Sequence, residues 1–148
     1  MSTTAAPPSG LTVKVLRCEA VQLVAESDIV VSRQKIRSWA TDAGFRLVDQ
    51  TKIVTAASEL ARNTVQYGGG GELVIELVDD TDRRGLRLTF RDEGPGIPDV
   101  DRAMQDGYTT GKGLGLGLSG SRRLMNEFEI RSELGRGTTI VTTRWRDR

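Results

Sequence analysis

The sequence has 148 residues, of which 37% are hydrophobic and 28% are charged, and this composition suits one globular domain with one core. A net charge of +1 gives no electrostatic reason to expect a nucleic-acid or a membrane partner, so we expect neither. One cysteine, Cys18, and no histidine exclude a disulfide framework, cysteine or histidine metal clusters and phosphohistidine chemistry within this sequence; with no long apolar run, they favour a reducing, cytoplasmic setting.

The first part of the sequence predicts a tail, a strand and a helix. Residues 1–10, MSTTAAPPSG, predict a disordered tail, because small residues and two prolines cannot build a core. Residues 11–18 alternate apolar and polar side chains, which predicts a short edge strand. Apolar residues at three- and four-residue spacing then predict a helix that Ser27 or Asp28 caps and that ends at Gly44.

A second helix is predicted from Asp49 to about Tyr67. Its buried stripe is Ile53, Ala57, Leu60 and Thr64. Glu59 and Asn63 lie four residues apart, so they stack about 6 Å apart along the helix axis. They flank the apolar stripe rather than oppose it, which places two polar groups at the rim of the core, where a ligand can reach them.

The second part of the sequence predicts two hairpins and a third main helix. The predicted elements are strands at 73–78 and 86–90, a short helix at 101–105, a helix at 116–128, and strands at 129–132 and 138–145. A charged turn at 79–85 joins the first two strands, and Gly135 and Gly137 form the last turn. The expected fold is a two-layer α/β (α+β) sandwich with helices on one face of a mixed, mostly antiparallel sheet, in a single domain over residues 11–148.

Two glycine-rich stretches frame the region before the third helix: DEGPG at 92–96 and GKGLGLG at 111–117. Glycine has no Cβ, so it lets the backbone approach a ligand closely. The second stretch alternates Gly113, Gly115 and Gly117 with Leu114, Leu116 and Leu118. Free amides on one side and apolar anchors on the other, at a helix N-terminus, predict a site for nucleotide phosphates. Taken alone, a flexible surface loop is the alternative.

The helix pair Glu59 and Asn63 has a chemical interpretation. Asn63 offers a neutral carbonyl oxygen, which suits a Mg²⁺ that takes most of its other ligands from water and phosphates. Glu59 can orient or deprotonate an attacking hydroxyl or water. Arg62, between them, can reach a phosphate or a partner, and a solvated position is the simpler alternative. Alone, the pair would more often be a solvated helix flank.

The stretches that follow the strands suggest a base-binding pocket. Asp92 can accept a hydrogen bond from an adenine amino group. Gly94 and Gly96 let the backbone lie against the base, and Thr138, after the turn glycines, can place a hydroxyl near the same pocket. Each feature alone is also an ordinary turn or strand residue. Their occurrence together and in order favours the functional interpretation.

These four motifs resemble those of the GHKL, or Bergerat-fold, ATP-binding family. ELARN at 59–63 matches the N-box, DEGPG the G1 box, GKGLGLG the G2 box and GRGTT the G3 element, and the resemblance extends from about residue 13 to 145. Within this family the sequence is most similar to the RsbT-type serine/threonine switch kinases of bacterial stress signalling. A dinucleotide fingerprint and a P-loop are set aside because the required strand context and the serine or threonine after Lys112 are missing.

The resemblance implies roles for individual residues. Glu59 would be the catalytic base and Asn63 would coordinate Mg²⁺. The glycine-rich loop would be the ATP lid, with Lys112 on a phosphate. The implied ATP-binding residues are Asn63, Asp92, Gly94, Gly96, Lys112, Gly113, Leu114, Gly115, Leu116, Gly117 and Thr138.

The resemblance also implies partners. The protein would be an ATP- and Mg²⁺-dependent serine/threonine kinase that phosphorylates a STAS-domain protein of the RsbS or RsbR kind. It would then be released to activate a PP2C-type phosphatase of the RsbU kind. Three alternatives remain open: an anti-sigma factor kinase that sequesters a sigma factor, a non-catalytic binding module that ATP switches, and a plain ATPase.

Overall fold

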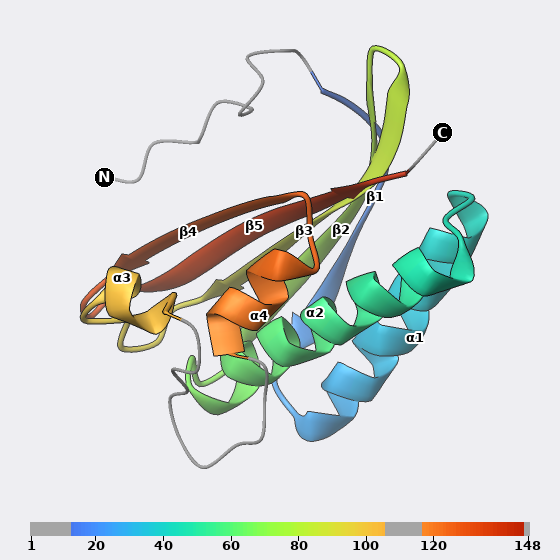
Figure 1. Ribbon diagram of the computed structural model, residues 1–148. Helices are drawn as coiled ribbons and strands as arrows, with labels where there is room; N and C mark the ends of the chain where they lie inside the picture. The colour runs from blue at the N-terminus through green and yellow to red at the C-terminus, as the bar shows by residue number, and fades with distance from the viewer. Residues whose placement is uncertain (1–12, 106–116, 147–148) are drawn as a thin grey trace.

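The computed structural model describes residues 13–105 and 117–146 and shows helices packed on one face of a five-stranded sheet (Figure 1). The elements are β1 (Lys14–Leu23), α1 (Glu26–Asp42), α2 (Leu47–Gln66), β2 (Gly71–Asp80), β3 (Arg83–Asp92), α3 (Val100–Ala103), α4 (Gly117–Arg123), β4 (Glu127–Glu133) and β5 (Gly137–Trp145). The predicted two-layer α/β sandwich is confirmed. The predicted tail at 1–10 lies outside the described residues, and no described helix is long and apolar enough to cross a membrane.

The strands lie in the order β1-β2-β3-β5-β4, and each of the four pairings between neighbours is antiparallel. The sequence predicted a mixed sheet, but the described strands contain no parallel pair. Two helices separate β1 from β2, and they return the chain to the end of β1, where Leu23 pairs with Gly71. The following strand therefore runs back alongside β1, which makes this pairing antiparallel.

The β2–β3 hairpin is longer than its predicted strands. Asp79 and Arg84 form an ion pair of 2.9 Å across it, and Asp80 and Arg83 form one of 2.7 Å. Charged residues that the sequence assigned to a turn at 79–85 thus continue the ladder, and the turn shrinks to the two residues between the strands.

β1 also extends beyond its predicted end at Cys18. It is an edge strand, as expected, but it continues to Leu23. Val21 and Leu23 alternate in the strand and are at most 8% exposed, so the burial of these two side chains against the helices explains the extension.

The start of α1 differs from the predicted cap. The residue at the cap position is Ala25, and Asp28 lies in the first helical turn. Its Oδ2 accepts hydrogen bonds from the backbone N–H groups of Val24 and Ala25, both at 2.9 Å. Asp28 thus reaches back to bind the incoming chain. The predicted end at Gly44 is confirmed, since Gly44 follows the cap residue Ala43 with a φ of +87°.

Asp28 gives the protein a pH-dependent contribution to stability. Hydrogen bonds from the backbone of Ala25 and of Val24 lower the pKa of the Asp28 carboxyl below its ordinary value of 3.8. The contribution is therefore present above this ordinary value and is lost as the pH falls through the lowered one. We expect Asp28→Ala to lower the free energy of unfolding at neutral pH, with a difference from wild type that shrinks on acidification in urea unfolding series. Ser27→Ala is the control, and an equal, pH-independent loss there would contradict this assignment.

Several helix boundaries differ from the predicted ones, and α3 covers Val100–Ala103 where the sequence predicted 101–105. α2 begins at Leu47, before the predicted Asp49. α4 ends at Arg123, whereas the sequence predicted a helix to 128. The reason lies in Asn126, whose N–H donates to Thr143 O at 3.0 Å, so the chain is already paired with β5 at this point. The residues from Glu127 onward therefore continue as β4.

One hydrophobic cluster lies between the sheet and the helices. Leu73, Phe90 and Ile140 are register neighbours on β2, β3 and β5, and each is at most 5% exposed. Ile53 and Leu60 of α2 are fully buried in the same cluster. α2 thus lies along the sheet with its apolar stripe inward, as the sequence predicted.

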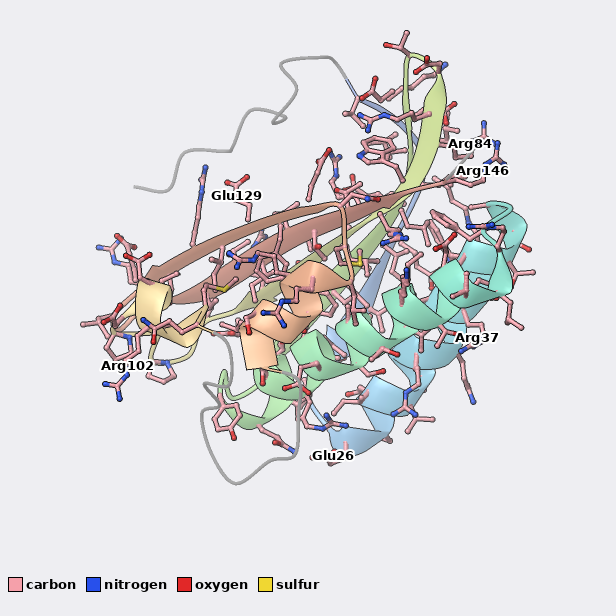
Figure 2. The ribbon with its side chains drawn as sticks, in the orientation of Figure 1. Glu26, Arg37, Arg84, Arg102, Glu129 and Arg146 are labelled. Carbon is pink, nitrogen blue, oxygen red and sulfur yellow. The ribbon has the colours of Figure 1, made fainter. Side chains whose placement is uncertain are left out.

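The opposite face of the sheet carries charged side chains in pairs. Arg87 and Glu76 form an ion pair of 2.8 Å, and Arg131 and Glu129 one of 3.2 Å. Figure 2 shows Glu129 projecting from the face that the helices leave open. Charged pairs are therefore prominent on this face, whereas the predicted residues Glu59 and Asp92 belong to the helix side and to a strand end.

Candidate functional site

The side chains of Glu59 and Asn63 lie one turn apart on α2. Glu59 is only 9% exposed, deeper than the rim position that the sequence suggested, and its Oε1 accepts a hydrogen bond from Arg62 Nη1 at 3.2 Å. Asn63 is half-buried, and its side chain makes no hydrogen bond within the described parts of the chain. Its amide oxygen is therefore available to a ligand.

A polar row closes the core at one end of the sheet. Asp92 of β3, Thr138 of β5 and Ser132 of β4 are register neighbours. Each lies two residues beyond a member of the apolar row Phe90, Ile140 and Ile130. Because side chains two residues apart in a strand share a face, the polar row is on the helix-covered face. The end of the core is thus lined by one carboxylate and two hydroxyls.

The Asp92 carboxylate is held in one orientation. Its Oδ1 accepts hydrogen bonds from the N–H groups of Gly94 at 2.9 Å and Thr138 at 3.2 Å. Its Oδ2 has no hydrogen bond within residues 13–105 and 117–146. Two N–H donors fix one oxygen and leave the other to accept from a ligand.

The turn that follows α2 packs directly on Asp92. A Cβ on Gly68 would lie 2.4 Å from Asp92 Cγ, and one on Gly94 would lie 2.6 Å from Gly68 O. Gly68 N donates to Asn63 O at 3.0 Å, so the same short stretch connects Asn63 with Asp92. The absence of side chains at these two glycines brings the helix and the loop together.

The loop after β3 lies against the β4–β5 turn. Gly135 N donates to Pro95 O at 2.9 Å, and Ile97 N donates to Ser132 Oγ at 2.7 Å. A Cβ on Gly96 would lie 2.3 Å from Glu133 O. The sequence predicted that Gly94 and Gly96 let the backbone lie against a base. The Cβ position of each glycine meets neighbouring backbone, and the contact with a base stays a prediction. Their smallness shapes the site through protein contacts.

Thr138 contributes through two groups. Its backbone N–H donates to Asp92, while its hydroxyl lies 2.8 Å from Ser132 Oγ. The predicted hydroxyl near the pocket therefore has a protein partner that the sequence interpretation did not include.

The predicted lid is described only at its end. Lys112, Gly113, Leu114, Gly115 and Leu116 lie outside the described residues, so their assignment stays a prediction. Gly117 is the buried first residue of α4, which packs on α2. The chain that follows the predicted lid is thus anchored against the helix that carries Glu59 and Asn63 (Figure 1).

Comparison with known proteins agrees with this arrangement. Residues 48–147 match the family described as histidine kinase-, DNA gyrase B-, and HSP90-like ATPase. The chain belongs to the GHKL ATPase family. It is 48% identical over 125 residues to the serine/threonine-protein kinase RsbT of Bacillus subtilis, which covers 84% of this chain and 94% of RsbT. It is 33% identical over 114 residues to the anti-sigma F factor of Geobacillus kaustophilus, covering 74% of this chain and 78% of that one.

Two solved structures share the GHKL fold. The structure of the RsbU and RsbW domains of Rv1364c from Mycobacterium tuberculosis has a TM-score of 0.62 at 22% identity, over 88% of this chain and 33% of that chain. The mycobacterial sensor histidine kinase MprB has a TM-score of 0.53 at 18% identity, over 88% and 98%. At these identities the likeness shows the fold alone. The similarity to RsbT confirms the predicted enzyme class, an ATP-dependent serine/threonine-protein kinase, and with the anti-sigma F factors it supports a kinase role in sigma-factor signalling.

The described residues would fit ATP if Asn63 were the protein ligand for Mg²⁺. No group of three or more Asp, Glu, Cys or His side chains in the described ranges could hold a metal by itself. Asn63 instead offers one side-chain carbonyl oxygen without a hydrogen bond in the described ranges, and Mg²⁺ commonly takes its remaining ligands from phosphates and water. A Mg²⁺ held by Asn63 would therefore need the nucleotide to complete its coordination.

Gly68 and Ser132 are site residues that sequence reasoning missed. Gly68 stands in a run of four glycines that was interpreted only as a helix end. Ser132 lies opposite Thr138 in the register of the last hairpin. The alternation of side chains in that hairpin could have predicted Ser132, because it places both hydroxyls on one face of the sheet.

A substitution at Gly137 tests the contact between the loop after β3 and the β4–β5 turn. Gly137 has a φ of +113°, and a Cβ there would lie 2.1 Å from Asp92 O. Gly135, with a φ of +78° and nothing within 4 Å, is the matched control. We expect Gly135→Ala to cost about 1–2 kcal/mol through its backbone conformation alone. Gly137→Ala should cost roughly a further 1–3 kcal/mol from overpacking and should weaken ATP binding, both measurable by urea unfolding and calorimetry. Equal losses would contradict the clash.

Proposed function

We propose that this protein transfers the γ-phosphate of Mg-ATP to a serine or threonine of a STAS-domain protein, and that it then binds and activates a PP2C-type phosphatase. The observation that carries the proposal is the fixed Asp92 carboxylate beside the end of the helix that bears Glu59 and Asn63, in a chain 48% identical to RsbT. The expected location is the cytoplasm.

The free oxygen of Asp92 would accept a hydrogen bond from the adenine amino group. Since Oδ1 is already bound by Gly94 and Thr138, only Oδ2 is left for the base. A base without a donor at this position would leave a carboxylate oxygen unpaired, which costs about 1–3 kcal/mol. Thr138 would support this recognition from the neighbouring strand.

Glu59 would act as the base for the acceptor hydroxyl, and Asn63 would hold Mg²⁺. Bound Mg²⁺ supplies neutralisation of the phosphate charge. Arg62, which donates to Glu59 Oε1, keeps the carboxylate oriented. Phosphoryl transfer needs mainly positioning and charge neutralisation, and a buried, oriented carboxylate meets the first need.

The partners are inferred from relatives. One solved structure contains RsbU and RsbW domains of the same polypeptide. This pairing supports an RsbU-like PP2C-type phosphatase as the second partner. The STAS-domain substrate rests on the likeness to RsbT.

The experiment is radiolabelled γ-phosphate transfer from Mg-ATP to a STAS-domain protein encoded with this one, with Asn63→Ala as a control. We expect label on serine or threonine, lost in the variant. Absence of transfer with ATP still bound by calorimetry would overturn the kinase proposal and leave a nucleotide-gated binding module.

Sequestration of a sigma factor is the second candidate. The 33% identity to an anti-sigma F factor favours it. Pull-down with purified sigma factors in the presence of ATP separates the two functions. A stable complex that a phosphorylatable partner dissolves would establish the anti-sigma function.

A further inference from the structure

Ser132 lies where three parts of the site meet. Its Oγ accepts from Ile97 N at 2.7 Å, lies 2.8 Å from Thr138 Oγ1 and lies 3.3 Å from Gly137 O. Ile97 lies in the loop between β3 and α3 that follows Asp92. Ser132 therefore connects this loop with the strand whose backbone fixes the Asp92 carboxylate.

The single proton of the Ser132 hydroxyl has two acceptors. Because Ile97 N already donates to its oxygen, this proton points either to Thr138 Oγ1 or to Gly137 O. The contact with Thr138 is the shorter one, 2.8 Å against 3.3 Å. When Ser132 donates to Thr138, the Thr138 proton is free for a ligand. In the opposite arrangement Thr138 offers only lone pairs.

This proton direction decides which base edge fits. A Thr138 donor beside the Asp92 acceptor forms a donor–acceptor pair on neighbouring strands. The Watson–Crick edge of adenine presents an amino donor beside a ring acceptor, whereas guanine presents an acceptor oxygen beside a ring N–H. The pair therefore complements adenine and opposes guanine.

We propose that Ser132 is a positioning residue that selects adenine over guanine by keeping the Thr138 hydroxyl a donor and by seating the loop at Ile97. The inference rests on the proposed nucleotide site. Ser132 joins that site as a residue that does not contact the ligand and acts through Thr138.

The test compares Ser132→Ala, Ser132→Cys and Ser132→Thr with the control Thr139→Ala. Thr139 is the next residue of β5, faces the other side of the sheet and makes no side-chain hydrogen bond in the described ranges. Calorimetry measures the Kd of the full chain for Mg-ATP and Mg-GTP, and transfer assays give kcat and KM. Circular dichroism and urea unfolding confirm that each variant is folded.

Ser132→Ala should weaken ATP binding about five- to tenfold, the worth of a lost hydrogen bond, and narrow the ATP-to-GTP preference by a similar factor. The value of kcat at saturating ATP should not change. Ser132→Thr should restore the preference, and Thr139→Ala should resemble wild type. Ser132→Cys fills the same space with a weak hydrogen-bonding group, so it should show the same trend if the alanine variant does not fold.

An unchanged ATP-to-GTP ratio in a folded Ser132→Ala or Ser132→Cys protein would overturn the inference. Equal loss of affinity for both nucleotides would overturn the inference too, because Ser132 would then only hold the loop in place and would not affect the choice of base. If the wild-type protein binds neither nucleotide, the proposed function itself fails, and this outcome is distinct from the other two.

Discussion

Glu59→Gln should lower the rate of γ-phosphate transfer by about 10²–10⁴-fold, the usual contribution of a general base. Glutamine keeps the shape of the side chain and an oxygen that accepts from Arg62, which in the wild type donates to Glu59 Oε1 at 3.2 Å. It removes only the ability to take a proton. Because Asp92 and Thr138 lie on other elements, the affinity for ATP should remain that of the wild type.

Single-turnover transfer with saturating Mg-ATP measures the chemical step, and calorimetry measures binding. Glu129→Gln, the same substitution on the open face of the sheet, is the matched control (Figure 2). Transfer at the wild-type rate by Glu59→Gln would exclude Glu59 as the base. A parallel loss of ATP binding would instead indicate that the substitution disturbs the site.

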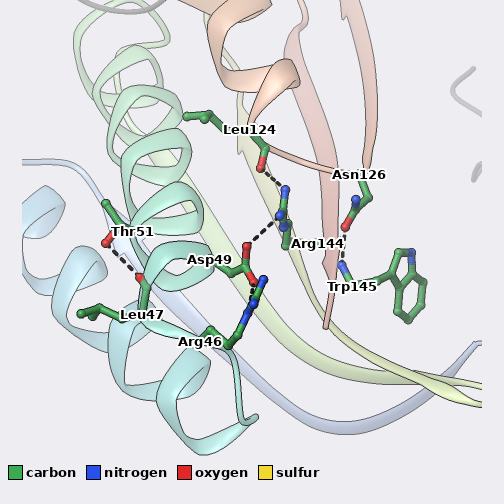
Figure 3. A network of polar contacts seen from close by, with 8 residues as sticks. All are labelled: Arg46, Leu47, Asp49, Thr51, Leu124, Asn126, Arg144 and Trp145. Atoms are coloured by element: carbon green, nitrogen blue, oxygen red, sulfur yellow. Dashed lines mark hydrogen bonds and ion pairs between the residues drawn. The ribbon is translucent and has the colours of Figure 1, made fainter. Parts of the chain in front are cut away.

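Arg144→Met should lower the free energy of unfolding by about 3–5 kcal/mol, because it leaves a buried carboxylate without its partner. Arg144 Nη2 donates to Asp49 Oδ1 at 2.9 Å and Nη1 donates to Leu124 O at 3.0 Å (Figure 3). The Arg144 and Asp49 side chains are 13% and 5% exposed. The network joins the first turn of α2, strand β5 and the end of α4. Arg46, 3.6 Å from Asp49, remains in the variant, but its side chain is largely exposed, so solvent screens this second ion pair.

Urea unfolding measures the loss. Arg84→Met makes the same substitution at a solvent-exposed pair with Asp79, where side chains are 42% and 35% exposed, and should cost far less. The double variant Asp49→Leu/Arg144→Met should be more stable than Arg144→Met, since it no longer buries a carboxylate that has lost its buried partner. Equal losses for Arg144→Met and Arg84→Met would show that burial does not govern this pair.

The sequence predicted the order of the elements well, because most of them carry a one-sided apolar pattern. The predicted boundaries were less accurate where charged residues interrupt the apolar pattern. Asp79 and Arg84 look like turn residues until their partners across the hairpin are known. The predicted third helix ran to 128 because Met125 and Phe128 fit a helical stripe, whereas Asn126 is already paired with β5.

The candidate site was predictable where one residue type suffices for the chemistry. Glu59, Asn63 and Asp92 were predicted from the chemistry that a carboxylate or an amide offers to ATP and Mg²⁺, and their roles stay predictions. Ser132 and Gly68 act through register and close packing, and such contacts depend on strands that the sequence alone does not align. The wholly antiparallel sheet was missed for the same reason.

Asp92 and Thr138, whose contact orients the carboxylate, stand 46 residues apart in the chain. During synthesis, residues 14–92 can build α1, α2 and the first three strands before β5 exists. Until β5 inserts between β3 and β4, Asp92 lacks the N–H of Thr138. If the nucleotide binds at Asp92, as proposed, it would bind and stabilise only the chain in which β5 has already paired. Pairing of strands that are distant in the sequence is intrinsically slow, so we expect the pairing of β3 with β5 to be a late step of folding.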